Sequence, residues 1–574
     1  MWKSIVLIFK VSFSLIRFSI GNSLIRFWPG ITRPVVEVRQ GKVRGITSTL
    51  PGGVKYHYFK GIPYGKPPVG KLRFQSPVPL ERFSQPVLNC SYDRPDLIQP
   101  DVVINRIVFG SEEGLYLNVF TPGLPNENDT KYPVMVFIHG GGYRYGSPTS
   151  FLYEPKSLVR RGVVVVSMSY RLGPLGFLSL PSAGISGNMG LKDQRLALQW
   201  VHENIGQFNG DAENVTLFGQ SAGSWSTYLH YLSPKSRKYF QRVICLSGDS
   251  CSEAAFQVDP EGKARKLAQL LGCRGNTDQE VLETLMKASA KSLVRLQSQV
   301  QNPLEDGDPL RVFLFKPVIE HESVEDSFIT QMPEQILKCY DSLQMPIMSG
   351  NVSSEGLLAL LLNRNNLDDY NKHVDWLVPR FMGYSAKLDR KAVGEQIKRF
   401  FVGEGNIGWN TADETSDLMT DSTFVGSSNL SAEWIAKYQP NVPHYKYFFT
   451  FEGRLNLFKI LYNMSEVHGV DHGDDVFYLF SPNFLPKLAK DSVENKMRGV
   501  YITLLTNFAK FNDPTPDESE LGFKWNPVAP VRRDSESFDF DCLEVNVPSR
   551  MVRNPNDERN DFWRNLLKVN TELL

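Results

Sequence analysis

The sequence predicts an α/β fold in which a large, mostly parallel central sheet is flanked by helices. Between about residues 130 and 350, short runs of β-branched and aromatic residues alternate with helical stretches. The run at 162–170 (GVVVVSMSY) contains four consecutive valines, which is typical of a strand covered on both faces. Buried strands separated by helices favour parallel pairing, because each helix carries the chain back to the start of the next strand.

The elements of this sheet can be placed in chain order. Strands are predicted at 132–139, 162–170, 215–218 and 242–246, and a strand-like run recurs at 445–451. Residues 191–205 predict an amphipathic helix, since their apolar side chains fall on one face. No linker or change of composition divides the second half of the chain, so we expect one large domain with long insertions.

Composition limits the functions that overall charge could support. The chain has 574 residues, with 63 Lys and Arg against 62 Asp and Glu, and a formal net charge of +1. This balance gives no general attraction to nucleic acid or to an acidic membrane. No nucleic-acid partner and no cofactor is expected, and the lack of a CxxC pair argues against a zinc site.

Residues 1–33 are predicted to be a signal peptide or another N-terminal leader. Residues 1–28 contain no Asp or Glu, and Lys3 precedes an apolar run, as in a secretory signal. Lys10 and Arg17 interrupt that run, and with Lys3 they would share one helical face, so an interfacial anchor or transit-like peptide is an alternative. No later segment is apolar enough to cross a bilayer, and a secreted chain without a transmembrane helix is expected.

Sequons and cysteines add to this picture. Six Asn-x-Ser/Thr sequons favour a secreted glycoprotein: Asn89, Asn128, Asn214, Asn351, Asn429 and Asn463. Asn214 opens an apolar run and is expected to be inaccessible. The six cysteines are too sparse for a disulfide scaffold, although one or two disulfide bonds can form among them.

The first candidate site residue is Ser221, in the GQSAG of residues 219–223. This GxSxG pattern follows a predicted strand and precedes a predicted helix, which is the context of a nucleophile elbow. The tight turn needs small residues two positions before and after the serine, and it places the hydroxyl at a helix N-terminus, where the helix dipole favours negative charge. The bare pattern also arises by chance, so a second motif is needed.

That second motif is the HGGG of residues 139–142, which directly follows the strand at 132–139. A glycine run there can aim backbone N–H groups at an oxyanion. It can also be no more than a tight loop that needs positive φ. Together with the GxSxG pattern it predicts an oxyanion hole formed by the N–H groups of Gly141, Gly142 and Ala222.

The general base would be a histidine that follows Ser221 in the chain. Five histidines follow at a useful distance: His321, His373, His444, His468 and His472. The last two stand among glycines in EVHGVDHGDD, which suggests a loop. A metal pair is not predicted, because HExxH needs Glu after the first histidine and a helix, and Gly469 supplies neither. These residues alone leave both histidines open as the base. Glu355, in a small-residue segment after a short apolar run, is the candidate acid, although taken alone it could be a solvated carboxylate.

Together the motifs resemble the type-B carboxylesterase/cholinesterase family from about residue 34 to the end of the chain. The matching stretches are FKGIPY at 59–64, PPVGKLRF at 67–74, LYLNV at 115–119, HGGG at 139–142, SYRLGPLGF at 169–177, NMGLKDQ at 188–194, GQSAG at 219–223 and GVDHGDDVFYLF at 469–480. The resemblance implies an α/β-hydrolase fold in which residues 34–574 form the catalytic domain. It also implies Ser221 as nucleophile, Glu355 as acid and His472, rather than His468, as base.

The chain departs from the family pattern at its cysteines. Leu97 and Gly114 stand where the first family disulfide belongs, so that bridge is expected to be absent. Cys273 resembles one half of a second family bridge, but Thr284 stands at its partner's position. A Cys251–Cys273 bridge is the substitute we consider.

Three features bear on the substrate. Residues 75–131 contain no Trp, whereas cholinesterases place one there to bind quaternary ammonium, so a choline-ester specialist is not expected. Most family members carry Glu at the position of Gln220. A Gln at this position is similar to the pattern of juvenile hormone esterases and related insect enzymes. Small residues after Ser247 and Gly248 imply a roomier pocket on the acid side of the ester.

The resemblance therefore implies a serine carboxylic ester hydrolase that forms an acyl-enzyme on Ser221 and takes a small-molecule ester. Within that class, a juvenile hormone esterase-like enzyme competes with a general carboxylesterase, and a lipase is a third reading. The alternative from another class is a catalytically silent adhesion or binding member of the same family. Silent relatives typically lack the serine or the histidine, and both are present here.

Overall fold

The computed structural model describes residues 32–571 except residues 51, 102–106, 128, 250–254, 340–342, 383–387, 518 and 536. Nearly all of the expected leader at 1–33, together with Asn128 and Cys251, therefore lies outside the described residues. Within the described part, no helix combines the length and the apolar character needed to cross a membrane.

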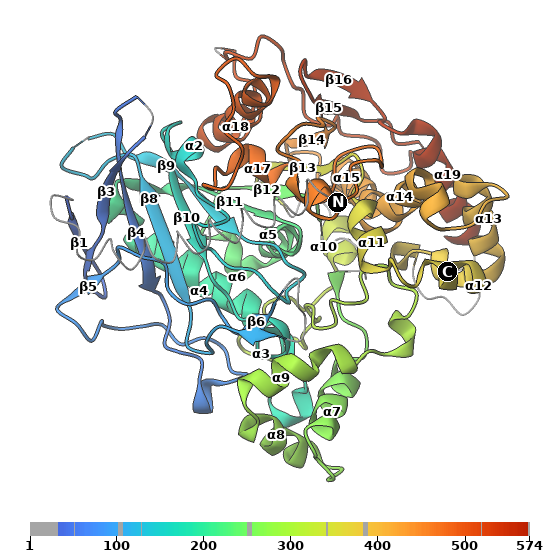
Figure 1. The fold of residues 1–574 in the computed structure, drawn as a ribbon, viewed down its shortest axis with the longest axis horizontal. Coiled ribbons are helices and arrows are strands. Elements are labelled where there is room, and N and C mark those ends of the chain that lie inside the picture. Colours follow the sequence, from blue (N-terminus) through green and yellow to red (C-terminus); the bar gives the residue numbers. More distant parts are fainter. Residues whose placement is uncertain are drawn as a thin grey trace.

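An eleven-stranded sheet forms the centre of the molecule (Figure 1). In spatial order its strands are β16 (Arg550–Arg553), β15 (Asp541–Val545), β14 (His444–Phe449), β13 (Ile347–Val352), β12 (Arg242–Leu246), β11 (Gly210–Gln220), β9 (Tyr132–Ile138), β10 (Val164–Met168), β8 (Tyr116–Thr121), β4 (Lys55–Pro63) and β3 (Ile46–Thr49). Neighbours from β15 to β10 pair in parallel, and the pairs at both edges are antiparallel. The predicted, mostly parallel sheet is confirmed. The prediction did not include the antiparallel strands at its two edges.

The remaining elements are two small sheets and the helices. One small sheet holds β1 (Val35–Val38), β2 (Gly41–Arg44) and β5 (Val87–Asn89), and the other holds β6 (Gln99–Pro100) and β7 (Val108–Phe109). The helices are α2 (Lys156–Val159), α3 (Gly173–Phe177), α4 (Met189–Asn204), α5 (Ala222–Leu232), α6 (Pro234–Arg237), α7 (Pro260–Leu270), α8 (Asp278–Lys287), α9 (Ala290–Leu296), α10 (Pro333–Lys338), α11 (Gly356–Leu362), α12 (Leu367–Lys372), α13 (Arg390–Val402), α14 (Ala412–Thr420), α15 (Gly426–Tyr438), α16 (Leu457–Leu461), α17 (Val476–Leu479), α18 (Val493–Phe511) and α19 (Asp557–Thr571).

Both faces of the central sheet are buried, and alternate residues of each strand divide between them. In β9, Val134 and Val136 belong to the core that includes the side chains of α4 and α5. Met135 and Phe137 belong to the opposite core, which includes those of α17 and α18. This double burial explains the unbroken apolar runs at 134–138 in β9 and 164–166 in β10.

The sequence-based boundaries are close for the central elements. The strand predicted at 242–246 coincides with β12, and the helix predicted at 191–205 is α4. β11 begins earlier than expected, at Gly210, because it pairs with β9 again beyond an irregularity between Gly210 and Val215. The predicted insertions are helical: Figure 1 shows α7, α8 and α9 together at the lower edge, and α12, α13 and α19 at the right.

No disulfide bond is present among the described residues, so the predicted bridges are not found. The thiols of Cys90, Cys245, Cys273, Cys339 and Cys542 are all free. The Cys251–Cys273 bridge is therefore wrong for Cys273, whose Sγ contacts the carbonyl of Gly275 instead. At the position of the first family bridge, a Cβ added to Gly114 would lie 2.2 Å from Cδ2 of Leu97, so leucine packing fills that space.

Two sequons are engaged in the interior. Asn351 lies within β13, where its Nδ2 donates a hydrogen bond to Oε1 of Glu355 at 3.2 Å. Asn214 is half-buried, and its Oδ1 accepts a hydrogen bond from Arg242 at 2.5 Å. A glycan on Asn351 would be attached to the buried Nδ2 that donates to Glu355, whereas the contact of Asn214 involves its Oδ1 and not the nitrogen to which a glycan is attached.

Candidate active site

Ser221 lies between the end of β11 and the start of α5. Its backbone has φ 59° and ψ −127°, a conformation that costs on the order of 1–3 kcal/mol for a residue with a side chain. Its N–H donates to the carbonyl of Leu246 at 3.0 Å, which ties the turn to β12. The strained turn is therefore fixed on both sides by the sheet and by the first turn of α5.

The two glycines of GQSAG are required by close backbone contacts. A Cβ at Gly219 would lie 2.1 Å from the carbonyl oxygen of Gly223, and one at Gly223 would lie 2.0 Å from that of Ile138. Neither neighbour can move away, because both are backbone atoms of packed elements. The tight approach of α5 to β9 depends on this absence of side chains.

The glycine loop that follows β9 lies directly against Ser221. A Cβ at Gly140 would be 2.9 Å from Cβ of Ser221. Gly141 and Gly142 have φ values of 114° and 61°, the left-handed region that glycine adopts without strain. Within the described structure, the N–H groups of Gly141, Gly142 and Ala222 donate to no protein acceptor.

Glu355 and His472 are brought together from distant parts of the chain. Glu355 follows β13 and precedes α11, and His472 lies in the loop between α16 and α17. Nδ1 of His472 donates to Oε2 of Glu355 at 2.5 Å, and both side chains are buried. The other oxygen of Glu355 accepts from the N–H of Val352 at 3.0 Å as well as from Asn351, so the carboxylate is held in place.

His468 lies in a different environment. Its side chain is 88% exposed, and its nearest carboxylate oxygen, on Asp413, is 3.9 Å away. The structure therefore brings His472, and not His468, into contact with Glu355.

The second nitrogen of His472 faces the residue before the candidate nucleophile. Because Nδ1 carries the proton given to Glu355, Nε2 of the neutral ring is an acceptor. Nε2 of Gln220 lies 3.2 Å from it and donates to it. No hydrogen bond joins Ser221 to His472 among the described contacts, a common feature of sites without bound substrate.

Buried acidic residues surround the imidazole. Burial by itself would lower the pKa of His472, but the carboxylate of Glu355, with those of Asp471 and Asp475, raises it above its ordinary value of 6.5. Burial raises the pKa of Asp475 to about 6, and Asp475 also accepts a hydrogen bond from Tyr501 at 2.9 Å. Burial likewise raises the pKa of Asp471 to about 7. The imidazolium form of His472 is therefore stabilised by several negative groups.

Sequence reasoning missed one contact on the imidazole. The ring of Phe424 stacks on that of His472, with centroids 4.6 Å apart and planes 28° from parallel. Phe424 belongs to a π-helical turn at Asp421–Val425, between α14 and α15. Such turns often occur at functional sites, but no motif in the sequence signals this one.

Comparisons with known proteins find relatives over most of the chain. A model of the carboxylesterase family matches residues 32–563. A Bombus ignitus protein named carboxylic ester hydrolase is 30% identical over 94% of this chain and 95% of its own length. A Tribolium castaneum juvenile hormone esterase is 32% identical over 87% of this chain and 86% of its own length.

A solved structure is similar over nearly the whole fold. The crystal structure of juvenile hormone esterase from Manduca sexta, with OTFP covalently attached, has a TM-score of 0.79 and 27% sequence identity to this chain. The match covers 94% of this chain and all of the Manduca chain. The likeness thus extends over the central sheet and the inserted helices alike.

Proposed function

Since the chain belongs to the carboxylesterase family and is a carboxylic ester hydrolase, we propose that it acts through Ser221, His472 and Glu355. Ser221 is the nucleophile, His472 the general base, and Glu355 the acid that orients the imidazole. The observation that carries this assignment is the 2.5 Å contact between Nδ1 of His472 and Oε2 of Glu355 beside a strained serine elbow.

The first half-reaction follows from this arrangement. Oγ of Ser221 attacks the ester carbonyl carbon while Nε2 of His472 takes the hydroxyl proton. Glu355 stabilises the imidazolium without taking its proton. The imidazolium then protonates the alkoxide of the leaving alcohol as the carbon–oxygen bond breaks, which leaves the acyl group on Ser221.

The second half-reaction hydrolyses the acyl-enzyme and regenerates the free serine. Water attacks the acyl carbonyl while Nε2 of His472 takes one of its protons. The imidazolium then returns that proton to Oγ of Ser221 as the carboxylic acid leaves. The unpartnered N–H groups of Gly141, Gly142 and Ala222 support their role as the oxyanion hole in both steps, and each such donor is worth ~2.7–4 kcal/mol to the transition state.

The substrate is proposed to be an uncharged small-molecule ester. The names of the Tribolium and Manduca relatives, together with Gln220, favour a juvenile hormone-like ester, and a broad range of carboxylic esters is the second candidate. The absence of Trp from residues 75–131 speaks against choline esters. A silent binding protein is disfavoured by the contact between His472 and Glu355, which has no evident use in such a protein.

Ester hydrolysis by the purified protein, beside its Ser221→Ala variant, tests this function. The panel contains esters graded in acyl length together with a juvenile hormone. Activity that disappears in the variant supports the serine mechanism, and the ranking of kcat/KM separates the hormone esterase from the generalist. A folded protein that hydrolyses none of these esters and resists an organophosphate would favour the binding protein.

The proposed catalytic domain is residues 34–574, preceded by a leader at 1–33 that directs secretion. The composition of the leader supports this proposal, and so does the family match, which begins at residue 32. Glycans are proposed at sequons other than Asn351, whose Nδ2 is buried and donates to Glu355, and Asn214, which is half-buried beside Arg242. N-terminal sequencing and glycan mapping of protein secreted from insect cells test both points.

A further inference from the structure

One buried carboxylate joins the C-terminal helix α19 to the π-helical turn Asp421–Val425 beside the proposed base. Asp421, the first residue of the turn, accepts hydrogen bonds from Arg559, at 2.6 Å from Nη2 and 2.9 Å from Nε. It accepts a third from Nε1 of Trp563 at 2.9 Å, and its side chain is only 3% exposed. A bidentate arginine contact and an indole donor fix both the position and the direction of this carboxylate.

The helix α19 also packs against α14, the helix that leads into the turn (Figure 1). Nη1 of Arg559 lies 2.6 Å from Oδ1 of Asp417 on α14. Trp563 belongs to the same apolar cluster as Leu418 and Met419, the residues that follow Asp417. Ion pairing and apolar packing therefore hold the end of α14 and the start of the turn against α19 as one unit.

On one side, this unit contacts the residue that follows the proposed acid. Oγ1 of Thr420, which precedes Asp421, accepts a hydrogen bond from the N–H of Gly356 at 2.9 Å. A Cβ at Gly356 would lie 2.1 Å from the carbonyl oxygen of Ser416 and 2.6 Å from the backbone nitrogen of Thr420, so the backbones are in close contact. A shift of α14 therefore displaces the backbone next to Glu355, since a packed interior transmits such movements.

On the other side, the turn contacts the proposed base. The ring of Phe424 stacks on the imidazole of His472, with centroids 4.6 Å apart, and it also stacks with Trp225. The N–H of Gly426 donates to the carbonyl of Asp421, five residues earlier, which is the π-helical pattern. Asp421 and Phe424 are thus fixed relative to each other within one turn, with the carboxylate on α19 and the ring on the base.

We propose that Asp421 is a positioning residue for the ester hydrolysis. Held by α19, it keeps Phe424 stacked on His472 and keeps α14 against the segment that follows Glu355. The stacked ring limits the rotation of the imidazole, so that Nδ1 stays directed at Glu355. Misplacement of a catalytic group by about 1 Å can cost on the order of 100-fold in rate, so this restraint matters for turnover. The inference rests on the proposed roles of His472 and Glu355.

Steady-state hydrolysis of 1-naphthyl acetate by Asp421→Asn tests the proposal. The amide lacks the charge that Arg559 binds, and kcat should fall on the order of 10- to 100-fold while KM changes little. Burial lowers the pKa of His472 and the contact with Glu355 offsets that effect, so a looser contact should move the acid limb of kcat/KM to lower pH. An ion pair that only stabilised the fold would lower Tm and leave kcat and the acid limb of the folded enzyme unchanged.

Two further variants show whether the effect passes through the stacked ring. In the Phe424→Leu background, Asp421→Asn should lower kcat much less than it does in the wild type, because the ring it positions is absent. Trp563→Phe keeps the ion pair with Arg559 and removes only the N–H donor to Asp421, so it should fold and lower kcat several-fold. Trp563→Phe therefore decides the proposal if Asp421→Asn does not fold.

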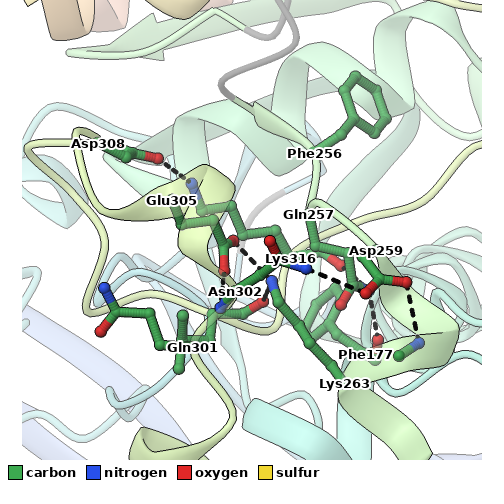
Figure 2. Close-up of polar contacts among 12 residues, drawn as sticks. Phe177, Phe256, Gln257, Asp259, Lys263, Gln301, Asn302, Glu305, Asp308 and Lys316 are labelled. Atoms are coloured by element: carbon green, nitrogen blue, oxygen red, sulfur yellow. Dashed lines mark hydrogen bonds and ion pairs between the residues drawn. The ribbon is translucent and has the colours of Figure 1, made fainter. Parts of the chain in front are cut away.

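Asp259→Ala is the control for a loss of stability alone. Figure 2 shows Asp259 at the start of α7, where its carboxylate accepts hydrogen bonds from the N–H of Gly262 and from Nδ2 of Asn302, each at 3.0 Å. Neither partner belongs to the π-helical turn or to the proposed triad. Loss of this helix cap should lower Tm, and kcat and the acid limb should stay at their wild-type values.

Three results would overturn the proposal. They are a wild-type kcat or an unshifted acid limb in folded Asp421→Asn, losses of Asp421→Asn and Phe424→Leu that multiply in the double variant, and a loss of kcat in Asp259→Ala as large as that in Asp421→Asn. Wild-type hydrolysis by His472→Ala would instead count against the proposed base. If His472→Ala is inactive and both Asp421→Asn and Trp563→Phe behave as the wild type, only the positioning role fails.

Discussion

Nε2 of Gln220 lies 3.2 Å from Nε2 of His472, the ring nitrogen that accepts the proton of Ser221 in the proposed mechanism. The side chain next to the proposed nucleophile thus occupies the lone pair of the proposed base in the resting structure. Glu355 holds Nδ1 of His472 on the opposite side of the ring. A substitution of Gln220 should therefore change the pKa of His472 through Nε2 while the contact with Glu355 is kept.

We expect Gln220→Glu to shift the acid limb of the pH profile upward. A carboxylate at this position favours the imidazolium and raises the pKa of His472 further, and only the neutral ring can act as base. The midpoint at which kcat/KM falls on acidification should therefore move to higher pH than in the wild type. Gln220→Met, which has similar size and no charge, is the control: it removes only the hydrogen bond that favours the neutral ring, so its midpoint should move upward less than that of Gln220→Glu.

Ser221→Ala and His472→Ala should each lower kcat by roughly a million-fold, since the members of a triad act as one unit. The Tm of Ser221→Ala should change little, because Ser221 makes no side-chain hydrogen bond in the described structure. His472→Ala should lower Tm, because it leaves the buried carboxylate of Glu355 without the imidazole. His468→Ala is the matched control, because its side chain is 88% exposed and lies in the same loop. Equal losses in the two histidine variants would contradict His472 as base.

Glu355→Gln should lower kcat on the order of 10⁴-fold while the structure is kept. The amide can still accept from Val352, but it no longer selects the tautomer with the proton on Nδ1. The acid limb should also move to lower pH, because the main group that raises the pKa of His472 is gone. A pH–rate profile of the residual activity measures both effects, and an unshifted limb would mean that Glu355 does not govern this pKa.

Gly223→Ala should destabilise the fold by about 1–3 kcal/mol or more, since overpacking against backbone cannot be relieved by a rotamer change. The new Cβ would lie 2.0 Å from the carbonyl oxygen of Ile138. Gly206→Ala is the matched control, because a Cβ there meets no atom within 4 Å. Urea unfolding of both variants gives the comparison, and equal midpoints would show that α5 can move away from β9.

The sequence was most informative where structure is locally determined. The buried strand at 242–246 was predicted to the residue, because a short apolar run between turn residues has few alternatives. Ser221 and the glycine loop were found because each motif sits at the end of such a strand. The antiparallel edge strands were missed, since their pairing partners lie far away in the chain and leave no local pattern.

Other features depend on contacts between distant segments. Phe424 and Gln220 reach His472 only once α14, β11 and the loop after α16 are packed together, so neither contact could be predicted. Glu355 and His472 were selected by family resemblance, and the residues themselves left His468 open. The disulfide prediction failed because free thiols and paired ones look alike in a sequence, and Cys273 is free.

The most direct test of the central claim is mass spectrometry of the purified protein after treatment with diisopropyl fluorophosphate. The proposed triad predicts a single phosphoryl adduct on the peptide that carries Ser221, formed in proportion to the loss of ester hydrolysis. It also predicts no adduct in Ser221→Ala. Hydrolysis that survives full modification of Ser221, or that disappears with an adduct on another residue, would contradict Ser221 as the nucleophile.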